Sequence, residues 1–205
     1  MTGDSLPLVL ASASPRRREL LAQLGLELIV VAPYVDERVL PGESPAVHAL
    51  RVAGLKARAV TPRFPKAPVL AADTVVVLGE EILGKPSDRK AARNMLLALC
   101  GRTHMVTTAV VLALGAVEVH HVEHARVTFV PSDENLVRWY LESGEGDDKA
   151  GAYAVQGKGA LFVERVQGNF QAVVGLPLAP LPSLFARVGL ILAARDGRLS
   201  LRRKT

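Results

Sequence analysis

The sequence of 205 residues has almost no cysteine and few aromatic residues. Its single cysteine, Cys100, excludes a disulfide framework and a zinc site built from cysteines, and it favours a reducing cytoplasm as the location. Phe, Trp and Tyr together make up 4% of the chain. This is too few to predict a surface on which the bases of single-stranded nucleic acid would stack.

Long apolar runs without charge or proline are also missing. The most apolar stretch, Val173–Ala194, contains three prolines and Arg187, whereas a membrane-spanning helix needs about 20 predominantly apolar residues. The N-terminus lacks a basic start followed by an apolar segment, so we expect no signal peptide. The sequence therefore predicts no membrane segment and no membrane partner.

Excess positive charge is confined to the C-terminus. The formal net charge is +5, and residues 195–205 contain five basic residues and one acidic residue. The rest of the chain is therefore close to neutral, so we expect no nucleic-acid partner. We predict a single domain over residues 1–194 and a basic tail at 195–205. A solvated, frayed end is the commoner explanation of such a tail, and a basic arm that binds nucleic acid is the alternative.

Apolar strands and capped helices are what the sequence contains. Apolar runs predict strands at residues 8–11, 26–31, 69–78, 105–114 and 117–130. A last helix is expected within residues 182–194, and the serines expected to cap the earlier helices are Ser14, Ser44, Ser87 and Ser132. Gly168-Asn169 predicts a hairpin between residues 161–166 and 170–174. Since hairpins interrupt the alternation of strands and helices, we predict an α/β fold with a mixed sheet.

The first candidate site is a serine- and arginine-rich helix start. Arg16, Arg17 and Arg18 follow Pro15 in the first helical turn, where each cation costs roughly 0.3–1 kcal/mol because the helix end is already positive. Serine hydroxyls, helix N–H groups and guanidinium groups together suit a phosphate. The candidate phosphate ligands are Ser12, Ser14, Arg16 and Arg17. Solvent exposure is the alternative for Arg17 and the preferred explanation for Arg18.

The second candidate is Asp73, which interrupts the apolar run Val69–Leu78. A carboxylate is costly to bury without a partner, so we interpret Asp73 as a metal ligand or a general base rather than a turn residue. Glu37 could supply a second carboxylate to a metal ion. Lys56 and Lys85 are candidates for binding phosphate oxygens, although an isolated lysine is more often solvated. The residues around Lys85 do not form a Walker loop.

The third candidate is a loop with four glycines between residues 145 and 160. Such a density implies positive φ angles or close approach of the backbone. Gln156 in this loop could bind the amide edge of a nucleotide base, and an ordinary polar turn is the open alternative.

These segments together resemble the Maf family of nucleotide pyrophosphatases over about Leu8 to Val188. Six motifs in the family's order carry the resemblance: Ser12–Arg17, Ala71–Thr74, Gly84–Pro86, Gly101–His104, Asp148–Tyr153 with Gln156-Gly157, and Val174–Leu178. The resemblance implies a Maf/ITPase-like α/β fold, with an elongated mixed sheet flanked by helices and two lobes around a central cleft. It also implies hydrolysis of a nucleoside triphosphate to monophosphate and pyrophosphate, assisted by Mg²⁺ or Mn²⁺.

The resemblance also implies residue roles. Asp73 corresponds to the family's proposed proton acceptor, whereas Arg16, Thr74 and Gln156 correspond to residues linked to substrate choice. Three further residues match groups that line the family's cleft, namely Glu37, Lys56 and Lys85. Glu37 and Asp73 are the expected metal ligands.

The late loop resembles that of the branch acting on dTTP and UTP. The chain departs from the family pattern at Gly146, where proline is usual, and at Asn169-Phe170-Gln171. The sequence does not rank dTTP, UTP, CTP and modified pyrimidines, and it leaves a homodimer open. The alternative function is a non-enzymatic regulator of cell division or septum formation that binds a nucleotide.

Overall fold

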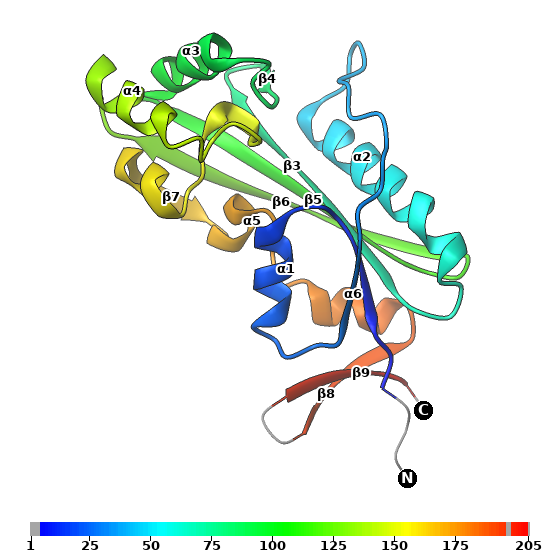
Figure 1. Cartoon of the computed structure of the whole chain (residues 1–205). Coiled ribbons are helices and arrows are strands. Elements are labelled where there is room, and N and C mark those ends of the chain that lie inside the picture. Colours follow the sequence, from blue (N-terminus) through cyan, green and yellow to red (C-terminus); the bar gives the residue numbers. More distant parts are fainter. Residues whose placement is uncertain (1–4, 196–197, 205) are drawn as a thin grey trace. The chain divides into compact units, whose positions relative to one another are not determined.

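The structure, a computed structural model, describes residues 5–195 and 198–204 (Figure 1). Its strands are β1 (Leu8–Ala11), β2 (Leu28–Val31), β3 (Val69–Leu78), β4 (Glu81–Leu83), β5 (Thr103–Leu114), β6 (Val117–Phe129), β7 (Val163–Gly168), β8 (Leu190–Arg195) and β9 (Arg198–Arg203). The α-helices are α1 (Pro15–Ala22), α2 (Pro45–Val60), α3 (Arg89–Leu99), α4 (Glu134–Glu142), α5 (Phe170–Val174) and α6 (Leu181–Arg187). The 3-10 helices are η1 (Thr61–Arg63), η2 (Ala150–Ala152) and η3 (Gly157–Phe162). Within the described part of the chain, no helix combines the length and apolar character needed to cross a membrane.

A seven-stranded mixed sheet flanked by helices organises the chain. Its order is β2-β1-β3-β5-β6-β7, and β4 pairs with β3 outside this path. The pairs β1–β2 and β1–β3 are parallel, whereas β3–β4 and β6–β7 are antiparallel. This arrangement confirms the predicted α/β class with a mixed sheet.

The chain divides into two compact units. The first comprises Met1–Asp73, Ala109–Val122 and Gly175–Thr205, and the second comprises Thr74–Thr108 and Glu123–Val174. Strands β3, β5 and β6 each contribute residues to both units.

In the first unit, β1 and α2 form the core that carries the candidate site. All four residues of β1 are fully buried, as expected for an apolar strand between parallel neighbours. Helix α2 begins where predicted, because the Ser44 side chain accepts a hydrogen bond from Val47 N and Pro45 occupies the first turn. Its buried face follows the helical period and includes two polar residues, His48 and Lys56, among the apolar ones.

In the second unit, aspartates rather than the predicted serines cap two helices. Asp88 accepts a hydrogen bond from Ala91 N at the start of α3, and Asp133 accepts one from Leu136 N at the start of α4. The predicted helices are therefore present, but Ser87 and Ser132 each lie one residue before the cap. Both residue types favour this position, so the sequence pattern alone was ambiguous.

The predicted hairpin around Gly168-Asn169 is wrong. Strand β7 pairs with β6 instead, with Gly168 opposite Ala125. The residues after Asn169 form helix α5, because the Asn169 side chain accepts hydrogen bonds from Gln171 N and Ala172 N. A side chain that caps the following N–H groups favours a helix over a hairpin turn.

The end of the chain also differs from the prediction. The expected helix within residues 182–194 ends at Arg187, and Gly189 follows with a φ of +76°. Strands β8 and β9 then form an antiparallel hairpin, drawn in red in Figure 1. The expectation of a frayed end does not hold for β9, because Leu201 is fully buried and bridges Leu6.

Candidate active site

A buried lysine joins two of the predicted carboxylates in the first unit. Lys56 lies on the buried face of α2 and Asp73 lies in the middle of β3, and each residue is 7% exposed. The Lys56 Nζ atom is 2.8 Å from Asp73 Oδ1 and 2.8 Å from Glu37 Oε1. We refer to Glu37, Lys56 and Asp73 as the carboxylate–lysine cluster.

Burial makes this arrangement energetically demanding. Asp73 follows four buried apolar residues of β3, and an ion removed from water is tolerated only when it is paired. Lys56 supplies the pairing charge. The alternative interpretation from the sequence, a solvated surface lysine, is therefore wrong for Lys56. Two carboxylates on one ammonium leave a formal charge of −1 on the cluster.

Arg17 is held beside the cluster and is not a solvent-facing side chain. It is 8% exposed, its Nε donates to the Gly175 carbonyl at 2.8 Å, and its Nη1 donates to Ser12 Oγ at 3.2 Å. Burial lowers the pKa of Arg17, while the charges of Asp73 and Glu37 oppose this shift and raise the pKa. The guanidinium is therefore fixed where it interacts electrostatically with both carboxylates.

The turn between β1 and α1 brings the other phosphate candidates to this region. Ser12 is 4% exposed and its Oγ accepts a hydrogen bond from Ser14 N at 3.1 Å. Ser14 occupies the N-cap position, but its side chain makes no capping hydrogen bond, in contrast to the prediction. Arg16 is half-buried, and Arg18 is exposed as expected. No acidic residue lies in the first turn of α1, so this helix start presents only positive groups.

The second unit carries Thr74, Lys85 and Gln156. The Thr74 Oγ1 lies 2.9 Å from the Oγ1 of Thr108, which donates to the Ala172 carbonyl. Lys85 and Gln156 are exposed, and their loops are joined because Gly151 N donates to the Gly84 carbonyl at 3.1 Å. In this unit the structure therefore links the loops of Lys85 and Gln156, whereas the contact given for Thr74 is with Thr108.

Side-chain anchors hold the loop that contains Gln156. Tyr153 OH lies 2.8 Å from His104 Nε2, and Tyr140 OH accepts a hydrogen bond from Ala154 N. On the other side of Gln156, the Glu145 carboxylate accepts hydrogen bonds from the backbone of Lys158 and Gly159. The sequence analysis assigned no supporting role to these residues, although His104 and Tyr153 lie in two of the motifs that carry the family resemblance.

The glycines of this loop meet the two conditions predicted for them. Gly151 and Gly157 have φ angles of +68° and +75°. A Cβ at Gly146 would lie 2.0 Å from Ala152 O, and one at Gly159 would lie 2.1 Å from Ala154 O. A proline or any other side chain at position 146 would therefore clash with the Ala152 carbonyl, which explains why this chain has glycine there.

Glu37 and Asp73 are also the groups that fit a divalent cation. In the regions 5–195 and 198–204, no group of three or more His, Cys, Asp or Glu side chains could hold a metal ion. Mg²⁺ is commonly held by one or two carboxylates together with water and phosphate oxygens. Two carboxylate oxygens that already meet at one cationic atom, Lys56 Nζ, match that requirement in ligand type and number.

A serine- and arginine-rich turn beside a buried carboxylate–lysine cluster suits the class of α/β proteins that bind phosphate groups. A family model described as "Maf-like protein" matches residues 7–188. The chain belongs to the Maf family, which confirms the resemblance inferred from its motifs.

Several named relatives cover nearly all of this chain. A dTTP/UTP pyrophosphatase of Anaeromyxobacter dehalogenans (strain 2CP-1 / ATCC BAA-258) is 55% identical over 187 residues, which is 89% of this chain and 94% of the relative. A protein of the same name from Myxococcus xanthus (strain DK1622) is 51% identical over 195 residues, covering 95% and 99%. Among solved structures, the Staphylococcus aureus Ham1 protein is similar with a TM-score of 0.42 and 17% identity, over 62% of this chain and 72% of that one.

Removing the Lys56 charge is expected to destabilise the fold. In Lys56→Met, Asp73 keeps a buried charge without its ammonium partner, so we expect the free energy of unfolding to fall by about 3–5 kcal/mol. The matched control is Arg58→Met on the same helix, whose ion pair with Glu118 is exposed and contributes about 0–1 kcal/mol. Urea denaturation with a chelator present measures both, and equal losses contradict the assigned pairing.

His104 is expected to make the stability of the protein depend on pH. Burial lowers the pKa of His104 to about 4 from 6.5. Between these values the unfolded chain binds a proton that the folded protein does not. The contribution of neutral His104 to the free energy of unfolding is therefore complete above pH 6.5 and is lost as the pH approaches 4.

The measurement for His104 is urea denaturation across this pH range. His104→Gln removes the titration, and the stability of the wild type relative to this variant should fall by on the order of 3 kcal/mol from pH 6.5 to 4. Replacement of the exposed His120 by Gln is the control. The same pH dependence in both variants would contradict the assignment.

Proposed function

We propose that this chain hydrolyses nucleoside triphosphates, dTTP and UTP in particular, to the monophosphate and pyrophosphate. The observation that carries the proposal is the buried carboxylate–lysine cluster beside Arg17, in a chain about half identical to relatives named dTTP/UTP pyrophosphatases. We also propose the cytoplasm as the location, because a chain with one cysteine suits a reducing compartment.

In the proposed reaction, Asp73 accepts a proton from the attacking water. The water oxygen bonds to the α-phosphorus, the bond from this phosphorus to the oxygen bridging the α- and β-phosphates breaks, and pyrophosphate leaves with the electron pair. Lys56 fixes the Asp73 carboxylate through its 2.8 Å hydrogen bond, so the proton acceptor keeps one orientation. General-base catalysis of this kind contributes typically about 10²–10⁴-fold to the rate.

Positive side chains neutralise the triphosphate in this proposal. Arg16 and Arg17, together with Ser12 and Ser14, bind phosphate oxygens at the start of α1. Arg17 is already fixed by the Gly175 carbonyl and Ser12, so little of its conformational entropy is lost on binding. Lys85 supplies a further ammonium for phosphate oxygens. A Mg²⁺ or Mn²⁺ ion held by Glu37 and Asp73 would, when bound, add charge neutralisation.

Gln156, Thr74 and Arg16 determine nucleotide choice in this proposal. A glutamine side chain offers both a carbonyl acceptor and an NH₂ donor, which matches the alternating acceptors and donor on the pairing edge of uracil and thymine. The Gln156 loop is held on both sides by Tyr153 and Glu145, so the carboxamide starts from a fixed backbone.

Replacing Asp73 by asparagine tests the catalytic role. Asp73→Asn keeps the size of the side chain but removes the proton acceptor, so turnover of dTTP should fall by about 10²–10⁴-fold while the affinity for dTTP remains within a few-fold. Turnover is measured by release of pyrophosphate, and affinity by calorimetric titration with a non-hydrolysable dTTP analogue. The matched control, Glu118→Gln, changes an exposed carboxylate. A variant with full turnover contradicts the catalytic role of Asp73, whereas a wild type that binds the analogue but releases no pyrophosphate favours the nucleotide-binding regulator instead.

The products identify the bond that is broken. We expect the purified protein with Mg²⁺ or Mn²⁺ to convert dTTP and UTP into monophosphate and pyrophosphate, with slower turnover of ATP and GTP. Chromatography of the nucleotides and a pyrophosphate assay read the result. Release of nucleoside diphosphate and orthophosphate would overturn the proposed reaction class.

A further inference from the structure

The position of Glu37 requires an explanation beyond its ion pair with Lys56. Glu37 lies in the segment 32–44, which connects β2 to α2 without a helix or strand of its own. Backbone in such a segment is not fixed by sheet or helix hydrogen bonds. Other contacts must therefore hold the Glu37 carboxylate 2.8 Å from Lys56 Nζ.

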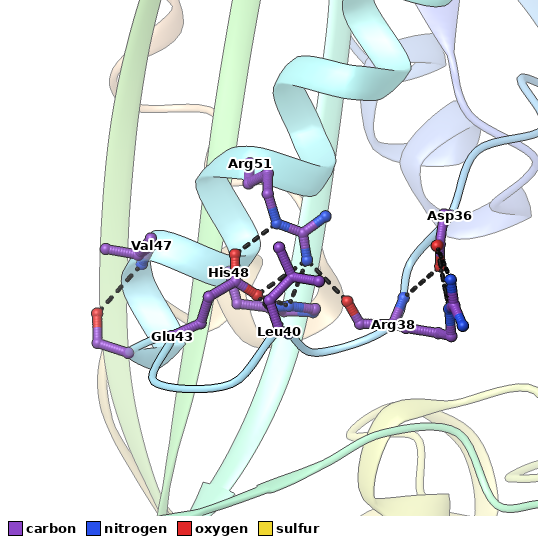
Figure 2. A network of polar contacts seen from close by, with 8 residues as sticks. Asp36, Arg38, Leu40, Glu43, Val47, His48 and Arg51 are labelled. Carbon is purple, nitrogen blue, oxygen red and sulfur yellow. Dashed lines mark hydrogen bonds and ion pairs between the residues drawn. The ribbon is translucent and has the colours of Figure 1, made fainter.

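A half-buried glutamate at the end of this segment organises those contacts (Figure 2). The Glu43 carboxylate binds the Nε and Nη2 atoms of Arg51 and accepts a hydrogen bond from Leu40 N at 2.9 Å. Its Oε2 also lies 3.1 Å from His48 Nδ1. The side chains of Glu43 and His48 are only 9% and 5% exposed. Hydrogen bonding by Arg51 lowers the pKa of Glu43 to about 2, so this carboxylate is charged at neutral pH.

Arg51 connects this glutamate to the chain beside Glu37. Its Nη2 donates to the Arg38 carbonyl at 2.7 Å, as Figure 2 shows. On the other side of Glu37, the Asp36 side chain accepts a hydrogen bond from Arg38 N at 3.0 Å. The peptide that carries Glu37 is thus restrained both before and after it.

Arg51 and Lys56 belong to the same helix, α2. One binds the backbone just after Glu37 and the other binds the Glu37 side chain. Because a helix is rigid over this distance, the two contacts together fix where the carboxylate lies relative to Asp73. A bidentate arginine–carboxylate pair is well suited to this task, since it fixes orientation as well as distance.

We propose that Glu43 and Arg51 are positioning residues for the hydrolysis. They hold the Arg38 carbonyl, and through it they hold the Glu37 carboxylate in the carboxylate–lysine cluster, where it takes part in binding the divalent cation. The inference rests on the proposed function, because it assigns Glu37 the metal-binding role given above.

Direct titration with Mn²⁺ tests this role without relying on turnover. Second-layer partners of metal ligands typically contribute about 10–100-fold to metal affinity. We expect Arg51→Met and Glu43→Gln to weaken Mn²⁺ binding by about tenfold or more, measured from the electron paramagnetic resonance signal of free Mn²⁺. Arg58→Met is the matched control, because Arg58 lies on the same helix and its ion pair with Glu118 of β6 is exposed, and this variant should bind Mn²⁺ as the wild type does.

A double-variant cycle separates positioning from general stabilisation. If Arg51 acts through Glu37, Arg51→Met should cost no further Mn²⁺ affinity once Glu37→Gln is present, whereas independent effects multiply. Arg51→Lys keeps a positive charge near Glu43 but lacks the planar fork that reaches both Glu43 and Arg38, so it should recover little affinity. Thermal unfolding of each variant verifies the fold, and Glu43→Gln serves if Arg51→Met does not fold.

The outcomes distinguish this inference from the proposed function. Unchanged Mn²⁺ affinity in Arg51→Met, or losses that multiply in the double variant, overturns the positioning role while leaving the proposed hydrolysis intact. Loss of affinity in Arg51→Met that disappears in the Glu37→Gln background supports it. A wild type that binds Mn²⁺ but releases no pyrophosphate from dTTP contradicts the proposed function, and the titration still reports on Arg51.

Discussion

The ion pair between Lys56 and Asp73 is the interaction on which the first unit's arrangement depends. Both groups are buried, so neither is stable in its charged form without the other. Satisfying them requires α2 to present Lys56 towards β3 and requires the segment with Glu37 to return to the same helix. A core made only of apolar residues would tolerate several packings of helix against sheet, whereas this pair tolerates far fewer. The apolar residues of β1 and α2 supply the stability within which this costly pair is accommodated.

Much of this arrangement could be predicted, because it obeys local rules. Strand β3 has the predicted bounds and helix α2 begins after the predicted Ser44 cap, since a ten-residue apolar run and a Ser-Pro start leave few alternatives. Asp73 was recognisable as a candidate functional residue because a carboxylate in that run needs a partner. The partner itself was less evident, although Lys56 falls on the helical stripe of buried residues with Ala49, Val52 and Ala53. That spacing already predicts a buried lysine, and hence a paired one.

Other features depended on contacts between residues far apart in the sequence. Arg17 is buried because the Gly175 carbonyl, 158 positions away, accepts its hydrogen bond, and no local pattern contains that information. Phe170–Val174 became a helix because Asn169 caps it and because β6 supplies another partner for β7. The β8–β9 hairpin was not predicted, because the basic residues of its second strand led us to interpret this segment as a tail. Leu199 and Leu201 nevertheless alternate with polar residues, as a strand requires.

The charges of the first unit explain why Arg16 and Arg17 are tolerated at a helix start. Arg17 and Lys56 interact with the carboxylates of Glu37 and Asp73, and Arg16 interacts electrostatically with Arg17, so these five groups carry one formal positive charge. The positive end of α1 adds to that excess, so in the proposed function the phosphate groups of the substrate stabilise a region that is unfavourable by itself. The carboxylates reduce the repulsion among the cations without cancelling it. In the proposed function the same groups satisfy two requirements, because Asp73 and Glu37 reduce the repulsion between the arginines in the free protein and still leave positive charge for a phosphate.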